Sequence, residues 1–567
     1  MLKPLKRDRK NCFSTLDIET APDGSVLDIA IFNGEKVTYF TGWREFFIYL
    51  QAVVSDDKRY QKFLAHSGGG FDYVSMIEFL LNNKKDFRFT FEVILSGSDI
   101  ALIELFIGDK KVQFIDTYKT LPASLANLSE LFNVTTKKQK IEKSNYKDMR
   151  KFKTDDPDLY YKYLGDDVIS LFEIAIAFEK ILDIEFFPVT AASLALYLFR
   201  RKFQTINLFK VKPEIDEFIS NAYAGGRVEC FEAGEFKDIK VYDVNSLYPS
   251  VMLTNEYPIG TPVKVSTFKS GKIGVYHIRF FQKDRTKPAV LWVKTKDTGL
   301  TFTYAGEGYF FNPEIEEALR QGVEIEILEG YVWIRSINLF KDFVEYYYKL
   351  RLKNKNNAIG YCCKIILNSL YGKFGQKENK SVLRRILDHD ELMKLIKNKN
   401  YEVKTYKATA ALYEITYNRP IDHRLIQLAA YTTSLARIRL YQALSDDVIY
   451  CDTDSVHIKD GNFRGRISDK IGDWKLENSG EGIYIGRKQY WLNGKAKFKG
   501  VKEFDILGKG EVLIKKDDYL KILNGESLGK KFLSFPKLKS VISGSPACRP
   551  YFITKTLERG RYLSSRK

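Results

Sequence analysis

Apolar and polar positions along the chain predict several strands that end in acidic residues. Two short apolar runs, residues 447–450 and 456–458, flank the string Cys451-Asp452-Thr453-Asp454-Ser455. A strand, an acidic turn and a second strand make a hairpin whose tip suits a divalent cation. The alternative is an ordinary hairpin, because aspartate is a favoured turn residue in any protein.

A second predicted strand carries an acidic residue at its end. Residues 240–244 form a buried pattern that runs into Asp243, and Pro249 beyond it cannot donate to a strand ladder. Asp243 and Asp454 would then supply carboxylates from two strands. Two Mg²⁺ ions need such a ligand set for in-line phosphoryl transfer.

A helical pattern lies between these two strands. Lys364, Asn368 and Tyr371 follow the spacing i, i+4 and i+7, so a helix places them on one face. A cation, an amide and an aromatic ring on one stripe suit a nucleoside triphosphate. The alternative is a solvated helix face with an exposed lysine.

The N-terminal region has acidic positions of its own. Residues 13–20 alternate like a strand, so Asp17 and Glu19 project on one face. Farther along, a glycine-rich turn leads to Asp72 at the start of a helix, and Tyr163 and Asp167 are one helical turn apart. The D-x-E pair alone is a weak signal, because about two copies are expected by chance in a chain of this length.

These strings resemble known motifs in both content and order. The strings D-V-N-S-L-Y-P-S from Asp243, K-I-I-L-N-S-L-Y-G-K from Lys364 and Y-C-D-T-D-S from Tyr450 resemble motifs A, B and C of family B DNA polymerases. The N-terminal strings resemble the three motifs of a DEDD-class proofreading exonuclease that uses a tyrosine. The length and the short C-terminal segment are similar to the protein-primed branch of phages and linear plasmids, the phage phi-29 type.

The resemblance implies roles at the polymerase site. Asp243, Asp454 and the residue Val244 would bind two Mg²⁺ ions, for which Mn²⁺ is a substitute, and Asp452 would support them. Lys364 would neutralise the triphosphate, and Tyr248 would close the sugar pocket. The nascent base pair would be framed by Asn368, Tyr371 and Gly372, and Val244 would also contact the nucleotide.

The resemblance also implies an exonuclease site with its own pair of metal ions. Their ligands would be Asp17, Glu19, Asp72 and Asp167, and Tyr163 would orient the attacking water. A lysine motif would place Lys138 near the scissile phosphate, with Lys137 and Lys140 as alternatives. The chain departs from the family at Ser67, where an asparagine is usual, and this puts the positioning of the single strand in doubt.

Three further strings resemble DNA-binding motifs of the family. Tyr223, Gly225 and Gly226 match a Tyr-x-Gly-Gly motif that binds the template strand, although such a string by itself is more often a plain turn. Thr433 and Arg437 would share a helix face toward the primer strand. Lys488 and Tyr490, predicted on one face of a strand, match a K-x-Y motif that holds the primer terminus.

The expected fold is α/β and α+β with several domains: an RNase H-like 3′-5′ exonuclease followed by a right-hand polymerase. The exonuclease domain is predicted at residues 1–185 and the polymerase domain at residues 186–567. Within the latter we predict a palm at about 186–258 and 429–520, insertion 1 at about 260–340, fingers at about 341–376, insertion 2 at about 377–428 and a thumb at about 521–567. By resemblance, insertion 1 contacts the priming protein, and insertion 2 encloses the template and displaces the other strand.

Composition agrees with a nucleic-acid partner. The formal net charge of +18 favours a polyanion, although a membrane surface would also attract it. No apolar run reaches the roughly 18 residues of a spanning helix, so no membrane association is expected. The six scattered cysteines lack a C-x-x-C pair and indicate reduced thiols.

The expected location is intracellular. The N-terminus is basic but lacks an apolar segment, so no secretory signal is expected. The location would be the host cytoplasm for a phage protein, or the mitochondrion for a plasmid protein.

The expected partners are template and primer DNA, deoxynucleoside triphosphates and a terminal protein, with the chain itself a monomer. One rival is a family B polymerase that extends only nucleic-acid primers. Another is an inactive DNA-binding relative, against which the complete set of metal carboxylates argues. A reverse transcriptase is disfavoured, because Thr453 separates the two aspartates of the turn.

Overall fold

The computed structural model describes most of the chain. The described residues are 1–3, 5, 12–139, 141–142, 144–295, 299–459, 461, 463–501, 514–549 and 551–559. Residues 4 and 6–10 of the basic N-terminus, Lys140, and residues 550 and 560–567 of the predicted thumb therefore lie outside them. Every helix in these ranges is too short or too polar to span a lipid bilayer.

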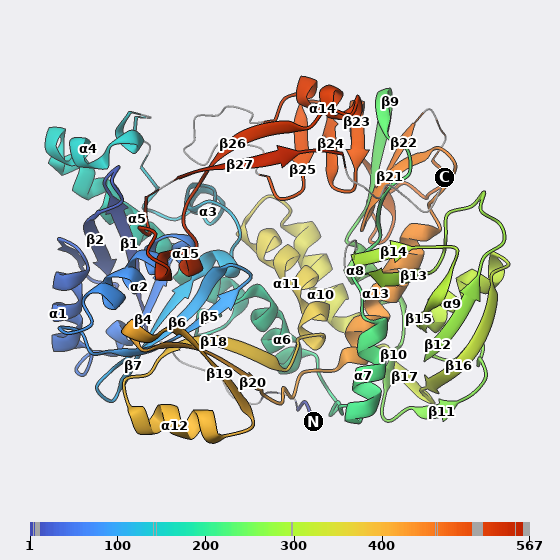
Figure 1. Cartoon of the computed structure of the whole chain (residues 1–567), viewed down its shortest axis with the longest axis horizontal. Helices are drawn as coiled ribbons and strands as arrows, with labels where there is room; N and C mark the ends of the chain where they lie inside the picture. The colour runs from blue at the N-terminus through green and yellow to red at the C-terminus, as the bar shows by residue number, and fades with distance from the viewer. Residues whose placement is uncertain are drawn as a thin grey trace.

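The N-terminal region is a mixed β-sheet covered by helices, drawn in blue in Figure 1. Strand β1 pairs with β2 in antiparallel and with β4 in parallel orientation. On β1, Leu16 and Ile18 are buried in one core, while Asp17 and Glu19 alternate with them. The strands are β1 (Ser14–Thr20), β2 (Val26–Phe32), β3 (Val37–Phe40), β4 (Lys62–Ala65), β5 (Thr90–Ser96), β6 (Asp99–Ile107) and β7 (Lys110–Asp116), and the helices are α1 (Trp43–Val53), α2 (Asp72–Asn82), α3 (Leu125–Leu131), α4 (Met149–Asp155) and α5 (Pro157–Leu182).

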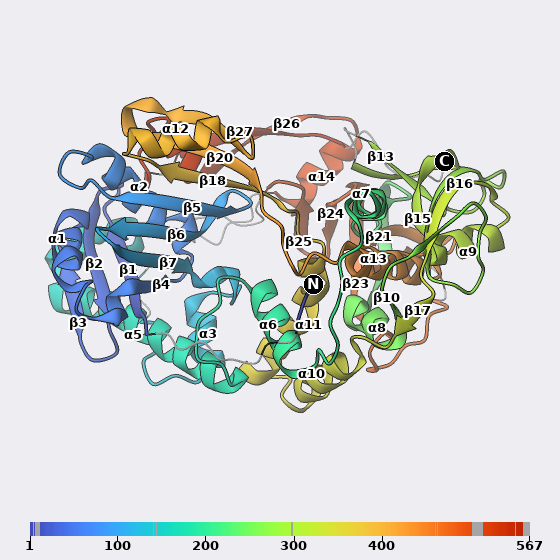
Figure 2. The same ribbon diagram turned by 90° about the horizontal axis from the view of Figure 1, so that it is seen from below.

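Insertion 2 extends this same sheet. Its strand β18 pairs with β5, where Leu383 lies opposite Val93 and Arg385 opposite Phe91. The complete order is β19-β20-β18-β5-β6-β7-β4-β1-β2-β3. The elements of insertion 2 are β18 (Asn379–Arg385), α12 (His389–Lys397), β19 (Tyr401–Lys407) and β20 (Leu412–Asn418), and Figure 2 shows them beside β5 and β6.

A second, antiparallel sheet lies on the other side of the molecule, with the order β25-β24-β23-β9-β22-β21-β8. Strands β21 and β22 form the predicted hairpin, and β9 is the predicted strand that runs into Asp243. Helices α8 and α13 pack on one another and on this sheet. The elements are β8 (Val228–Cys230), β9 (Gly234–Val244), α8 (Leu247–Thr254), α13 (Ile426–Tyr441), β21 (Val448–Asp452), β22 (Ser455–Lys459), β23 (Trp474–Gly486), β24 (Gln489–Leu492) and β25 (Lys495–Phe498).

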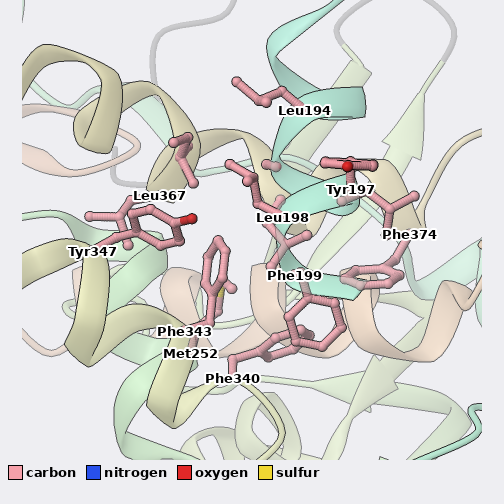
Figure 3. Packing of buried hydrophobic residues seen from close by; sticks show 14 of the residues in the cluster. Leu194, Tyr197, Leu198, Phe199, Met252, Phe340, Phe343, Tyr347, Leu367 and Phe374 are labelled. Carbon is pink, nitrogen blue, oxygen red and sulfur yellow. The ribbon is translucent and has the colours of Figure 1, made fainter. Parts of the chain in front are cut away.

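A helical core joins the two sheets. Figure 3 shows Leu198 and Phe199 of one helix packed against Phe340, Phe343 and neighbouring apolar side chains. The helices of this central region are α6 (Ala191–Lys202), α7 (Pro213–Ala222), α10 (Lys341–Lys353) and α11 (Ala358–Phe374). This core holds α11 beside α13 and α8, next to the end of the antiparallel sheet.

Insertion 1 and the strand just before it form a separate four-stranded sheet, β11-β16-β12-β15, and two two-stranded sheets, β10-β17 and β13-β14. Helix α9 packs on β12 and β15 and also on α13 of the larger sheet. The elements are β10 (Tyr257–Ile259), β11 (Val263–Val265), β12 (Gly274–Phe281), β13 (Trp292–Thr295), β14 (Gly299–Phe302), β15 (Ala305–Phe311), α9 (Asn312–Arg320), β16 (Glu324–Val332) and β17 (Arg335–Ile337).

The C-terminal segment crosses between the two sides of the molecule. Its hairpin, β26 (Leu528–Ser534) with β27 (Tyr551–Leu557), follows α14 (Lys516–Leu523) near the antiparallel sheet. At the far end of the hairpin, α15 (Leu538–Ile542) packs on α2 of the N-terminal region. Both views show this bridge. The predicted α/β and α+β fold class is confirmed: a mixed sheet with helices is followed by an antiparallel sheet with helices.

Candidate active sites

Four acidic side chains meet at the first candidate site, in the N-terminal region. Strand β1 contributes Asp17 and Glu19, α5 contributes Asp167, and α2 begins at Asp72. All but Asp72 line a cavity of about 310 Å³ that Tyr163 also lines. The predicted strand, turn and helix positions of these residues are confirmed, and the fold brings all of them together.

Burial and mutual repulsion dominate the electrostatics of this site. Burial raises the pKa of Asp17 well above its ordinary value, and the carboxylates of Asp72 and Asp167 raise it further. Burial, followed by Asp167, raises the pKa of Glu19 to about 8. Burial raises the pKa of Asp72 to about 7. Such a group of crowded carboxyls favours a bound cation.

Lys138 supplies a positive charge within the same cavity. Its ammonium contacts Asp167 and lies 4.9 Å from the centre of the Tyr163 ring. Burial opposes its charge, yet Asp167 and Asp17 together raise its pKa. Lys137 instead donates to the carbonyl of Ser129 at 2.7 Å, so of the two described lysines only Lys138 lies in the cavity.

The donor chemistry of this site suits metal ions. The Oδ1 atoms of Asp72 and Asp167 are buried and have no hydrogen-bond partner, and such unsatisfied carboxylate oxygens are natural ligands for a hard cation. Among the described residues, no three acidic, histidine or cysteine side chains are grouped closely enough to hold a metal ion as they stand. The ammonium of Lys138 neutralises part of the negative charge of Asp167.

Ser67 and Gly69 lie in the glycine-rich turn before Asp72, where the backbone is tightly constrained. Ser67 has a left-handed backbone with φ 63°, and a side chain at Gly69 would collide with the carbonyl of Ile100. Asp116, only 2% exposed, accepts the amide of Tyr118 at 3.0 Å and interacts with the amides of Ser67 and Gly69. Asp116 therefore holds the turn from β7. This role of Asp116 could not be predicted from the sequence, because the contact depends on which strand lies beside the turn.

The second candidate site lies at the end of the antiparallel sheet. Asp243 is the penultimate residue of β9, and it lies opposite Ser455 of β22. The amide of Val244 donates to the carbonyl of Asp454 at 2.8 Å, which joins the strand end to the acidic turn. The expected convergence of Asp243 and Asp454 is observed. Thr453, with φ 63°, makes the sharp turn between Asp452 and Asp454.

A further carboxylate lies at this site. Burial, then Asp454, then Glu477 raise the pKa of Asp243 to about 7. Burial and Asp452 chiefly raise the pKa of Asp454, and Glu477 adds to this shift. Glu477 was missed in the sequence because it lies on β23, which pairs with β9 from a distant part of the chain.

Helix α11 presents the predicted polar stripe. Lys364 and Asn368 are exposed and Tyr371 is half-buried, as one solvent-facing stripe requires. The ammonium of Lys364 lies close enough to Asp243 to lower its pKa. Tyr371 stacks on Tyr248, with ring centres 4.2 Å apart. Gly372 follows Tyr371 on the same helix. These candidate nucleotide contacts therefore lie along α11 and at the start of α8.

The loop at residues 223–227 lies between this helix and the acidic turn. Gly375, after α11, leaves no room for a side chain because of the Tyr223 ring, and Gly226 leaves none because of Thr453. The amide of Thr453 donates to the carbonyl of Arg227 at 2.8 Å. Tyr223, Gly225 and Gly226 are therefore placed beside the candidate catalytic turn.

The predicted placement of Lys488 and Tyr490 on one strand face is wrong. Lys488 lies in the turn before β24 with φ 56°, and its ammonium contacts both carboxylate oxygens of Asp452 at 2.9 Å. Tyr490 is half-buried and stacks on Tyr484. The tight turn rotates Lys488 away from the strand periodicity.

The predicted orientation of Thr433 and Arg437 toward the primer is also wrong. Both residues are 2% exposed, within a helix that is buried along most of its circumference. Thr433 donates to the carbonyl of Ala430 at 3.0 Å. Arg437 is ion-paired with Glu314. Helix α13 is covered on one side by the sheet and on another by insertion 1, so neither side chain reaches solvent.

Comparison with known proteins places the chain in a family. The chain matches the family described as DNA polymerase type B, organellar and viral, over residues 55–161 and 144–470. It is 24% identical to a probable DNA polymerase of Ascobolus immersus, covering 84% of this chain and 45% of the relative. It is 27% identical to the DNA-directed DNA polymerase of Enterobacteria phage PRD1, covering 80% and 76% respectively. The chain thus spans about half the length of its fungal relative.

The fold has a close counterpart among solved structures. Phi29 DNA polymerase complexed with primer-template DNA and incoming nucleotide substrates superimposes with a TM-score of 0.74 at 19% identity. The match covers 97% of this chain and 100% of the other. The same protein complexed with single-stranded DNA matches with a TM-score of 0.64.

Proposed function

Because the chain belongs to the type B DNA polymerases of organelles and viruses, we propose that it copies a DNA template and degrades 3′ ends at a separate site. The observation that carries the proposal is the convergence of Asp243 and Asp454 at one sheet end, beside the polar stripe of α11. Nucleotidyl transfer needs that combination of a carboxylate pair and a cationic nucleotide-binding face.

At the polymerase site, Asp243, Asp454 and the backbone of Val244 would hold two Mg²⁺ ions. Bound metal supplies Lewis-acid stabilisation of the charge on the phosphoryl oxygens. Lys364 orients and neutralises the triphosphate from the exposed stripe of α11, and Asn368, Tyr371 and Gly372 flank the new base pair. Lys488 keeps Asp452 paired in this structure, and we propose that it exchanges this contact for the primer phosphate.

At the exonuclease site, Asp17, Glu19, Asp72 and Asp167 would hold a second pair of ions. Tyr163 orients the attacking water, because its ring stands in the cavity beside Asp167. The ammonium of Lys138 contacts the scissile phosphate once DNA displaces it from Asp167. The half of the cavity lined by His66 and Ser67 accepts the 3′ nucleotide.

Protein priming and strand displacement belong to the same proposal. Insertion 1 is a separate sheet attached beside the palm, and this geometry suits a surface for a terminal protein. Its test is a reaction in which deoxynucleotide and the candidate terminal protein are the only substrates. A polymerase that uses only nucleic-acid primers would label no protein there, yet would still extend an annealed primer.

The decisive experiment for the proposed function is primer extension by the purified chain. We expect labelled primer to lengthen with template, deoxynucleotides and Mg²⁺, and to shorten when nucleotides are omitted. Chelation should stop both reactions. DNA binding without either reaction would instead identify an inactive relative.

Replacing Tyr248 with valine is expected to weaken discrimination against ribonucleotides. The Tyr248 ring stacks on Tyr371 near the end of α11, and its removal opens space where a 2′-hydroxyl must fit. Loss of such a steric contact should reduce the deoxy-to-ribo preference by about tenfold or more. Single-nucleotide insertion kinetics with both sugars measure it.

The matched control for this change is Tyr348→Val, a half-buried tyrosine on α10. This control should leave the deoxy-to-ribo ratio at its parental value. An unaltered ratio in Tyr248→Val would remove Tyr248 from the sugar pocket.

A further inference from the structure

A buried ion pair connects insertion 1 to the helix behind the polymerase site. The Arg437 guanidinium donates to Glu314 through Nε at 2.9 Å and through a terminal nitrogen at 3.1 Å. The two side chains are each 1% exposed in this pair. Arg437 belongs to α13, whereas Glu314 belongs to α9 of insertion 1.

The pair is completed by a tryptophan from the same insertion. The Trp292 indole donates to the Oε1 atom of Glu314 at 2.8 Å, and its ring lies 5.2 Å from the Arg437 guanidinium carbon. Glu314 thus receives hydrogen bonds from both partners within a dry environment. We call these three residues the 314–437 cluster.

On its other side, the 314–437 cluster holds the loop at residues 223–227. The remaining terminal nitrogen of Arg437 donates to the carbonyl of Ala224 at 2.8 Å and to that of Gly225 at 3.1 Å. The next residue, Gly226, packs directly against Thr453 of the catalytic turn. Three contiguous contacts therefore connect insertion 1 to the turn that carries Asp454.

The chemistry of arginine accounts for this arrangement. Its planar group offers five donors in fixed directions, so one side chain can bind a carboxylate and two backbone carbonyls together. Removing either charge from a buried pair leaves the other unsolvated and strongly disfavoured. By keeping Arg437 in place, Glu314 therefore helps to fix the positions of the loop carbonyls.

We propose that Arg437 is a positioning residue that acts on the polymerase site through the 223–227 loop, with Glu314 and Trp292 of insertion 1 as its anchors. Insertion 1 then supports ordinary DNA-primed synthesis, in addition to any role in binding a protein primer. This inference rests on the proposed polymerase function.

A positioning role and general electrostatics predict opposite changes in DNA affinity when Glu314 is neutralised. Neutralising Glu314 removes a negative charge from a protein that binds a polyanion, so general electrostatics predict tighter DNA binding. A positioning role predicts weaker binding, because Arg437 loses its partner and the loop shifts. The salt dependence also differs, since a lysine or arginine that contacts phosphate contributes about one unit of slope.

The test is Glu314→Gln, compared with Glu307→Gln as its matched control. Glu307 is a half-exposed carboxylate of insertion 1 that pairs with Arg279 and His277 rather than with Arg437. We expect Glu314→Gln to weaken primer-template binding about tenfold with an unaltered salt slope, because a buried partner is lost. Glu307→Gln should bind DNA at least as tightly as the parent.

Two milder variants test the proposal if Glu314→Gln folds poorly. Trp292→Phe removes only the indole donor, and Arg437→Lys retains the charge but cannot bridge three acceptors. Both should weaken primer-template binding and extension with an unchanged salt slope, while degradation of single-stranded DNA stays at the parental rate.

Different results reject the inference and the proposed function. Unchanged or tighter primer-template binding by Glu314→Gln, or parental binding and extension by Arg437→Lys, would overturn the positioning role. A parent chain that extends no primer would reject the polymerase function itself.

Discussion

Replacing Asp454 with alanine is expected to abolish primer extension while leaving 3′-5′ degradation intact, and Asp17→Ala is expected to do the reverse. Asp17 lies on β1 of the mixed sheet and Asp454 in the turn between β21 and β22 of the antiparallel sheet, and each has its own acidic neighbours. A bound metal stabilises the transition state by several kcal/mol, so each loss should reach about 10³-fold or more in rate. Extension and degradation assays on the same preparations measure both effects.

Loss of folding is not the expected cause of either defect. At the polymerase site, Asp454 repels the half-buried Asp243 and contributes to raising the pKa of Asp243, so removing Asp454 relieves an unfavourable interaction. The melting temperature of Asp454→Ala should equal or exceed that of the parent. The exposed Asp446, just before β21, provides a control whose replacement should leave both activities unchanged. If one of the two alanine variants melted normally and lost both activities, the two functions would share a site.

Deleting residues 379–418 is expected to destabilise the N-terminal region and reduce degradation as well as strand displacement. Leu383 and Leu412 are buried in the core that includes Leu16 and Ile18 of β1. Each such loss from a core costs about 2–5 kcal/mol, against a typical domain stability of about 5–15 kcal/mol. The deletion also leaves β5 as an exposed edge strand.

Arg385 adds to this effect. It is 1% exposed, and its guanidinium donates to the carbonyl of Phe87 at 3.2 Å, close to the C-terminal end of α2. A cation at this helix end complements its dipole, and α2 is the helix that begins with Asp72. Hydrogen exchange of β5 and α2, together with degradation of single-stranded DNA, measures the change. A deletion variant with parental protection and degradation would show that these strands are dispensable.

Strand displacement therefore needs a less disruptive test. Of the basic side chains in insertion 2, Lys380 pairs with Glu92 and Arg384 with Glu391, whereas Lys394, Lys397 and Lys399 are exposed. Changing the last three to glutamine should preserve degradation and gap filling but reduce synthesis through a downstream duplex. Lys58, Lys110 and Lys111, changed in the same way, remove the same number of charges and provide the charge-matched control. Equal displacement by both variants would exclude these lysines from unwinding.

Short-range rules applied to the sequence are enough to predict the local geometry of the candidate sites. Asp17 and Glu19 share one strand face because side chains alternate along a strand. Tyr163 and Asp167 share one helix face because four residues complete about one turn. The acidic hairpin and the polar stripe of α11 follow from the same short-range rules, so a motif could be placed on its element before any contact was known.

Tertiary packing, in contrast, sets which helix faces are buried and which strands pair. Thr433 and Arg437 occupy regular helix positions, yet the packing of insertion 1 and the palm on α13 buries them. Glu477 reaches Asp243 through the register of β23 with β9. Arg385 reaches the Leu80 carbonyl of α2 through the pairing of β18 with β5. Such contacts join residues far apart in the chain. They depend on the summed burial energy of whole elements, whereas local periodicity depends only on the backbone geometry of a few adjacent residues.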